Sequence, residues 1–219
     1  MYIVPLRNAD PPIIPRDRLD QFIQDVFHNY DELYEYHRGL VEKFLEIQRE
    51  QHPEIRSVTA PLFDAALNFR DAYLEYIPNY PIAAYRIDDE MANNPAFKAF
   101  VEVRLFVSVF SLFTNCLQAT IRHPDAHRLD MKNFINRPIP RLLRYELLLK
   151  AILEETPADH EDTLSIPEVI EIIKSLGKES EPGVASAKQK VQLWRYNSDL
   201  VFKPGETIVR QMTGVAAGC

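Results

Sequence analysis

Apolar side chains recur at spacings of three and four residues along most of this 219-residue chain, and this period constrains the possible folds most strongly. The longest stripe runs over residues 19–48 and predicts one amphipathic helix of about eight turns. Prolines stand between the periodic segments, and 16 prolines against 6 glycines disfavour a turn-rich β architecture. The sequence therefore predicts an all-α helical bundle.

Proline and glycine positions set the remaining boundaries that the sequence predicts. Pro78 and Pro81 are expected to break a helix, and Gly177 with Pro182 is expected to separate the last two helices. Residues 1–18 are rich in proline and are predicted to be extended. After the first long helix, the expected helical segments are 58–77, 82–91, 96–101, 130–136, 140–155, 165–176 and 184–200.

Composition excludes several classes of protein. The formal net charge of −7 disfavours a nucleic-acid binder, which would need a basic face. Cys116 and Cys219 are too few for a disulfide framework. The longest apolar run, 105–117, is shorter than the roughly 20 residues of a membrane span, so we expect a cytoplasmic chain without direct membrane insertion. His123 and His127 have metal-ligand spacing but lack a clear third ligand, so no metal or cofactor is predicted.

The most informative segment is the predicted helix of residues 140–155, because it is apolar on too many sides. On a helical wheel, the predicted buried stripe is Leu142, Tyr145, Leu149 and Ile152, the predicted second contact face is Leu143 and Leu147, and the third face is Arg141, Arg144, Leu148 and Ala151. Arginines beside apolar groups are typical of protein-binding faces. A central bundle helix whose arginine stems cover apolar surface explains the third face equally well.

The same segment resembles the third conserved region of the Dbl-homology domain, the catalytic module of Rho-family guanine nucleotide exchange factors. That region carries Pro-x-Gln-Arg-x-x-(Lys/Arg)-Tyr-x-Leu-Leu-Leu-Lys, followed shortly by Thr-Pro-x-x-His. The matching residues here are Pro138, Arg141, Arg144, Tyr145, Leu147, Leu148, Leu149, Lys150, Thr156, Pro157 and His160. Residues 26–37 resemble the second conserved region, and residues 200–206 resemble the join to a pleckstrin-homology domain in fungal factors of the cell-wall-signalling type.

The resemblance implies an elongated helical bundle over residues 19–200 that stimulates GDP release from a Rho-family small GTPase. It implies that Arg144 faces the GTPase switch region, that Leu148 makes an apolar contact one turn on, and that Arg141 is the conserved arginine of the motif. Ala151 on the same face and Gly177 on the final long helix complete the implied GTPase-binding set. The partner would be a GTPase with bound GDP, reached at the cell cortex through regions outside this chain.

The sequence departs from the family pattern in four places. The first conserved helix, whose glutamate contacts the GTPase, has no counterpart, so we expect an N-terminally truncated domain. Pro140 replaces the usual glutamine, and Gly177 replaces an asparagine. Residues 103–118 have no counterpart and are interpreted as a translated intron, or alternatively as a longer buried helix. Residues 201–219 leave the pattern where a pleckstrin-homology domain would begin, and are expected to start a truncated linker.

Two other functions remain open at this point. The chain could be a catalytically impaired helical scaffold or GTPase-binding module, because the first conserved helix is absent. A helical adaptor without any link to GTPases is disfavoured by the Arg-Tyr-x-Leu-Leu-Leu pattern from Arg144 to Leu149. The oligomeric state does not follow from the sequence.

Overall fold

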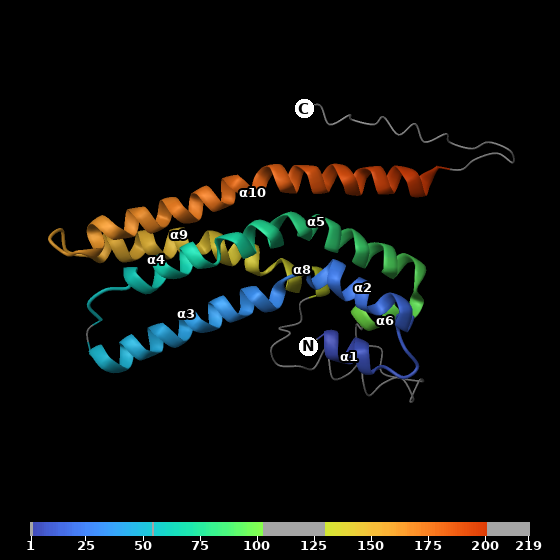
Figure 1. Cartoon of the computed structure of the whole chain (residues 1–219), viewed down its shortest axis with the longest axis horizontal. Helices are drawn as coiled ribbons and strands as arrows, with labels where there is room; N and C mark the ends of the chain where they lie inside the picture. The colour runs from blue at the N-terminus through green and yellow to red at the C-terminus, as the bar shows by residue number, and fades with distance from the viewer. Residues whose placement is uncertain (1, 54, 103–129, 201–219) are drawn as a thin grey trace, which may run out of the picture.

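The computed structural model describes residues 2–53, 55–102 and 130–200, and all the regular elements in these ranges are α-helices. Figure 1 shows an elongated molecule in which α10 runs along one long side, next to α5 and α9. The predicted all-α, elongated bundle is confirmed. The helices are α1 (Ile3–Asn8), α2 (Arg16–Phe27), α3 (Tyr30–Gln51), α4 (Thr59–Asn68), α5 (Arg70–Asn93), α6 (Pro95–Glu102), α8 (Met131–Asn136), α9 (Pro138–Glu155) and α10 (Asp162–Asp199).

Three expectations concern residues for which the structure gives no description. They are the interpretation of 103–118 as a translated intron, the pair His123 and His127, and the linker expected over 201–219. All three lie outside the described residues and stay predictions.

Two apolar cores lie along the molecule, and α5 contributes to both. Tyr73 and Tyr76 of α5 belong to the first core, which also takes residues from α3, α4, α9 and α10. Ala83 and Ile87, further along α5, belong to the second core, together with residues from α1, α2, α6 and α8. Because one helix crosses both clusters, the two cores are joined by continuous backbone.

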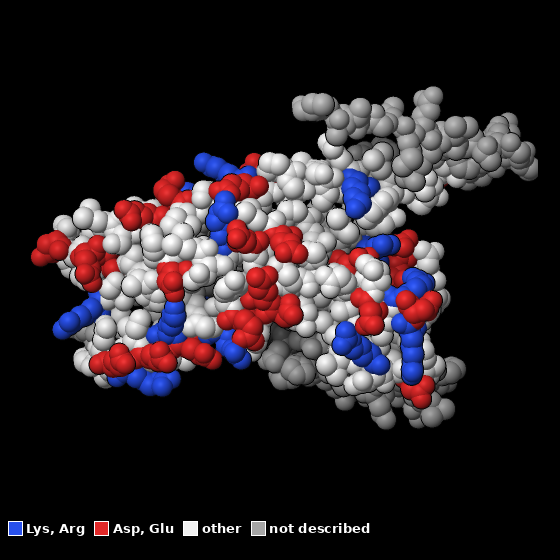
Figure 2. Space-filling view, viewed as in Figure 1, with Lys and Arg blue, Asp and Glu red and all other residues white. Residues whose placement is uncertain are grey.

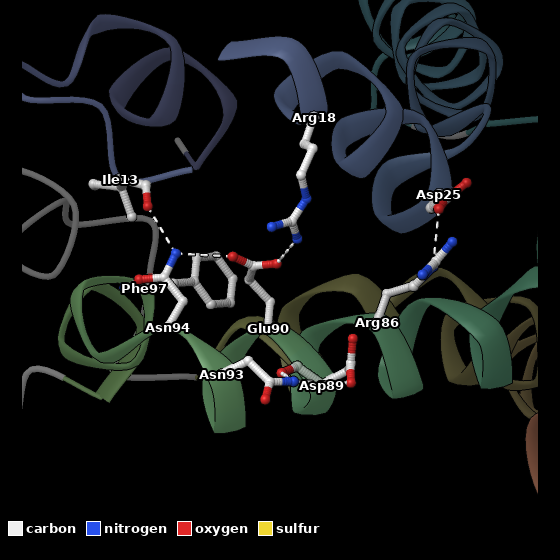
Figure 3. A network of polar contacts seen from close by, with 9 residues as sticks. All are labelled: Ile13, Arg18, Asp25, Arg86, Asp89, Glu90, Asn93, Asn94 and Phe97. Carbon is white, nitrogen blue, oxygen red and sulfur yellow. Dashed lines mark hydrogen bonds and ion pairs between the residues drawn. The ribbon is translucent and has the colours of Figure 1, made fainter. Parts of the chain in front are cut away.

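A polar network closes the second core (Figure 3). The buried carboxylate of Glu90 accepts from Arg18 Nη2 at 2.6 Å and from Asn94 Nδ2 at 2.8 Å. Asn94 also donates to the carbonyl of Ile13, and its side-chain oxygen accepts from the backbone N–H of Phe97. Asn94 therefore caps α6 while it ties the loop before α2 to the end of α5, and no hydrogen-bonding atom of Glu90 is left without a partner.

Two further ion pairs between helices lie at the surface. Figure 2 shows basic and acidic side chains interspersed over one face of the molecule. Lys43 of α3 pairs with Asp64 of α4, and Arg70 of α5 pairs with Glu179 of α10. Such exposed pairs contribute about 0–1 kcal/mol each, so the two apolar cores provide most of the stability.

The predicted helix over 19–48 is wrong in one respect, because it is two helices. The chain leaves the helical conformation at His28, which has a positive φ of 50°, and starts again after Asn29. Asn29 Nδ2 donates to the backbone carbonyl of Ala72 at 3.0 Å. The apolar spacing continues through the break because both helices turn apolar faces toward α5, so periodicity alone could not reveal it.

The predicted break at Pro78 and Pro81 is also wrong, since both lie inside α5. Each proline removes one backbone hydrogen bond, at a cost of about 3 kcal/mol. Burial of α5 side chains in a core on either side of the two prolines offsets that loss. Residues 1–18 are likewise not fully extended, because α1 forms there and packs Leu6 into the second core.

The last two predicted helices are one continuous helix, α10, with Gly177, Pro182 and Gly183 inside it. It begins at Asp162, whose buried carboxylate accepts from Ser57 Oγ and Thr59 Oγ1 and from the N–H of Val58. Burial alone raises the pKa of Asp162, but these hydrogen bonds outweigh burial and hold its pKa below the ordinary value. The start of α10 is thereby fastened to the segment that joins α3 to α4.

Close packing of α5 on α10 explains why residue 183 is a glycine. A Cβ atom built on Gly183 would lie 2.7 Å from Cγ and 3.0 Å from Cβ of Pro78, whose ring cannot turn away. A glycine inside a helix normally costs about 1 kcal/mol relative to alanine. At this crossing, the absence of a side chain allows the two helices to meet.

We predict that Gly183→Ala lowers the free energy of unfolding by about 1–2 kcal/mol, because the clash with Pro78 exceeds the gain in helix propensity. Gly39→Ala in α3 is the matched control, since nothing lies within 4 Å of its added Cβ. The control should raise stability by up to about 1 kcal/mol. Urea denaturation of both variants measures the difference, and a stabilised Gly183→Ala variant would contradict this account of the crossing.

Candidate functional site

Helix α9 is held in the first core by one stripe of side chains. Leu142, Tyr145 and Leu149 are buried, as predicted, and they pack with residues of α5 and α10. The helix starts at Pro138, where a proline is well tolerated because the first helical N–H groups have no partner within the helix. At the other end, Thr156 Oγ1 donates to the carbonyl of Ile152 at 2.7 Å. Both ends and the buried side of α9 are therefore fixed.

An exposed face beside this stripe carries the docking face, defined as Arg141, Arg144, Leu148 and Ala151. All four side chains are exposed, and Leu148 retains 51% of its accessible surface. Their spacing of three and four residues places them along one line of the helix. The structure thus confirms that the two arginines and the leucine share one exposed face, while their role in binding stays a prediction.

Three leucine and isoleucine positions differ from the wheel prediction. Ile152 was assigned to the buried stripe but is 38% exposed, because it lies at the edge of that stripe, next to Arg141 on the wheel. Leu143 and Leu147 were assigned to a second contact face, but they are 53% and 66% exposed. Helix α10 passes beside this face, but Gly177 has no side chain to cover Leu143, and Lys174 pairs with Glu146 of α9 at 3.7 Å.

Gly177 lies apart from the docking face. It is partly buried in α10, and a Cβ built on it would lie 4.0 Å from Leu143 Cδ2. Gly177 therefore sits on the side of α9 that carries Leu143, whereas Arg144 and Leu148 lie on another side. Of the five predicted binding residues, the structure brings four together and separates this one.

A polar cluster under α9 was not singled out as functional by the sequence. His37 of α3 lies between two tyrosines, with Nε2 2.7 Å from the Tyr73 hydroxyl and Nδ1 3.2 Å from the Tyr145 hydroxyl. The Tyr73 hydroxyl also donates to the carbonyl of Pro138 at 3.3 Å. Arg141 of the docking face lies over the Tyr145 ring, 5.1 Å from its centroid. A histidine among apolar positions of a predicted helix was the only available signal.

Burial governs protonation in this cluster. It raises the pKa of Tyr73, so that hydroxyl stays protonated. It also lowers the pKa of His37, with a further contribution from the positive charge of Arg141. His37 is therefore neutral at neutral pH and can both donate and accept a hydrogen bond.

Metal sites and membrane spans are absent from the part of the chain that the structure describes. Over 2–53, 55–102 and 130–200, no group of three or more His, Cys, Asp or Glu side chains is arranged to hold a metal ion. None of the helices in those ranges combines the length and apolar character of a membrane span. The docking face on α9 remains the strongest candidate.

Comparison with known proteins shows which family the chain resembles. The family model described as the RhoGEF domain matches residues 1–181. Rho1 guanine nucleotide exchange factor 1 of Schizosaccharomyces pombe is 28% identical over 203 residues, covering 88% of this chain and 13% of that protein. Rho1 guanine nucleotide exchange factor 2 of the same yeast is 25% identical over 205 residues, covering 94% of this chain and 16% of that protein. The chain thus spans less than a fifth of these relatives.

Solved structures share the fold. The DH/PH fragment of PDZRHOGEF, crystallised with human RhoA, covers 90% of this chain and 51% of its own chain, with a TM-score of 0.69 and 19% identity. The DH/PH domains of p115-RhoGEF cover 90% of this chain and 48% of their own, with a TM-score of 0.67 and 19% identity. The helical arrangement around α9 is therefore a known one.

We predict opposite outcomes for two leucines of α9. Leu149→Ala leaves a cavity in the first core and should lower the free energy of unfolding by about 2–5 kcal/mol. Leu147→Ala removes the same atoms from an exposed position and should change stability by less than about 0.5 kcal/mol. Thermal or urea unfolding of the two variants measures both values. Equal losses would mean that α9 is not seated by the Leu149 stripe.

Proposed function

The chain belongs to the RhoGEF domain family, and on that basis we propose that it binds a Rho-family small GTPase and accelerates release of the bound GDP. The observation that carries the proposal is the docking face. Arg144 and Leu148 occupy the motif positions that resemble GTPase contacts in this family, and both side chains are exposed on α9. Two other motif residues, Tyr145 and Leu149, are buried and hold the helix in place.

The proposed activity is differential binding and involves no covalent bond change. A small GTPase holds its nucleotide through a phosphate-binding loop, a lysine and Mg²⁺. A protein that binds the nucleotide-free conformer more tightly than the loaded one weakens nucleotide affinity by the same factor, because the two equilibria are linked. The released site then takes up whichever nucleotide is in excess.

The chemistry of the docking face suits a protein partner. A guanidinium group offers several N–H donors in one plane, which match carboxylate and carbonyl acceptors. Leu148, one turn beyond Arg144, offers apolar area that a partner surface would remove from water. Interfaces that combine arginine with buried apolar groups concentrate their binding energy in such residues.

A second candidate is a GTPase-binding scaffold with little exchange activity. Gly177 favours it, because this position has no side chain to offer and lies under Leu143, away from Arg144. Binding would then persist through the docking face while displacement of the nucleotide is weak. This candidate and the leading one predict the same binding but different rates of GDP release.

Regions beyond this chain would bring the domain to its target. The chain spans 13–16% of the two yeast relatives, so most of each relative lies outside the match. We propose that the domain acts from the cytoplasm and is brought to the cell cortex by such regions.

We predict that Arg144→Glu weakens binding to nucleotide-free GTPase by about 2–4 kcal/mol, roughly 30-fold or more, because a binding cation becomes an anion at the centre of the docking face. Helix content should not change, since the side chain is exposed. Binding to Schizosaccharomyces pombe Rho1 and to human RhoA, and release of fluorescent GDP from both, are the measurements.

Arg16→Glu is the matched control for this experiment. It makes the same charge change at an exposed position, the first residue of α2, beside the second core. Binding and exchange should be unaltered in the control. Unaltered binding in Arg144→Glu would refute the docking face, whereas normal binding by the unsubstituted chain without faster GDP release would favour the scaffold.

A further inference from the structure

The side chain of His37 is enclosed by aromatic rings beneath α9. Its ring is stacked on that of Phe69, with centroids 5.7 Å apart, and on that of Tyr145, with centroids 6.2 Å apart and planes within 9°. The edge of Tyr73 approaches it as well, at 5.9 Å. These rings come from two other parts of the chain, residues 69–73 and α9, so the orientation of the imidazole is set by tertiary packing.

The hydrogen bonds around His37 define one arrangement of protons. The Pro138 carbonyl can only accept, so the Tyr73 hydroxyl donates to it. The Tyr73 oxygen then accepts from Nε2–H of His37, at 2.7 Å. With its one proton on Nε2, the neutral imidazole accepts at Nδ1 from the Tyr145 hydroxyl, at 3.2 Å. His37 thereby holds the Tyr145 hydroxyl, while Tyr73 and Pro138 hold His37.

Tyr145, which His37 holds, also contacts a residue of the docking face. The guanidinium carbon of Arg141 lies 5.1 Å from the centroid of the Tyr145 ring. A cation over an aromatic face is attracted by the ring's quadrupole, so the Tyr145 ring gives this exposed arginine a preferred place. A side chain that is already ordered loses less rotamer entropy when a partner binds.

We propose that His37 is a positioning residue, which fixes the ring of Tyr145 and through it orients Arg141 on the docking face. This inference rests on the proposed function, because it takes the docking face to be the surface that meets a GTPase. In this proposal His37 does not contact the partner, because both of its ring nitrogens are engaged by Tyr73 and Tyr145.

Protonation of His37 should make GTPase binding depend on pH, which a residue that only fills space would not do. The titratable and charged groups facing His37 are Tyr73 from α5 and Tyr145 and Arg141 from α9, while Phe69 contributes an uncharged ring. Protonated His37 would carry a hydrogen on Nδ1 that faces the Tyr145 hydroxyl, and would add a positive charge near Arg141. The Tyr145–Arg141 contact is therefore expected to weaken in acid.

Acid should also lower the free energy of unfolding, over a pH range that is set by His37. The pKa of His37 is lowered by burial and by Arg141, so the unfolded chain binds this proton more readily than the folded chain. The free energy of unfolding therefore decreases as the pH falls below the ordinary value of 6.5, and the loss is complete below the folded pKa.

A double-mutant cycle on the full chain tests the proposal. His37→Phe keeps an aromatic ring between Phe69 and Tyr145 but removes both nitrogens. We expect five- to twentyfold weaker binding to nucleotide-free Rho1 or RhoA in the wild-type background. In the Arg141→Ala background, His37→Phe should weaken this binding less than twofold, because the residue through which His37 acts is absent. Equal losses in the two backgrounds would overturn the proposal.

Phe22→Leu, a substitution in the second core, is the control for an effect on binding that comes only from lost stability. If Phe22→Leu lowers the free energy of unfolding as much as His37→Phe does, the Phe22→Leu variant should still bind the GTPase normally. Binding by the unsubstituted chain should weaken as the pH falls through the lowered pKa of His37, and His37→Phe should remove that dependence. A pH dependence that persists in His37→Phe would count against the role of His37.

A measurement without any GTPase separates failure of this inference from failure of the proposed function. The NMR resonance of Arg141 Nε–H reports its place over the Tyr145 ring in the free chain. It should move in His37→Phe and stay unchanged in Phe22→Leu. If the chain binds neither GTPase, the proposed function fails while a moved Arg141 resonance still supports the coupling. An unmoved resonance overturns the coupling whatever binds.

Discussion

The seating of α9 by Leu142, Tyr145 and Leu149 is the interaction on which the candidate site depends. Burial of this stripe in the first core leaves the rest of the helix surface exposed, so the packing that stabilises the first core also presents Arg144 and Leu148. Core and docking face are two sides of one helix. A change that loosened the stripe would disturb the face even if no exposed residue were altered.

Helix α5 links the core that holds α9 to the rest of the molecule. It supplies side chains to both cores and carries the largest share of the contacts made by α10. Pro78, inside α5, lies directly against Gly183 of α10. The two helices can approach this closely only because residue 183 has no side chain, and the approach gives a fixed support behind α9.

Buried hydrogen bonds orient the helices at points where apolar packing has no directional preference. Asp162 joins the start of α10 to the segment between α3 and α4, and His37 joins α3 to α5 and α9. Each buried polar atom in these two clusters has a partner, as the cost of leaving one unpaired requires. Hydrogen bonds are directional, so they set the rotation of α9 and α10 more narrowly than leucine contacts do.

The sequence by itself determined the helical character of the chain, the motif on α9 and the division of that helix into a buried and an exposed side, because helical period and residue type are local properties. Tertiary structure alone decided that α5 continues through Pro78, that the first long stripe breaks at His28, and that Leu147 stays uncovered. It also brought His37 to Tyr145, more than a hundred positions away. A local period shows which residues share a face, but what covers that face depends on distant segments.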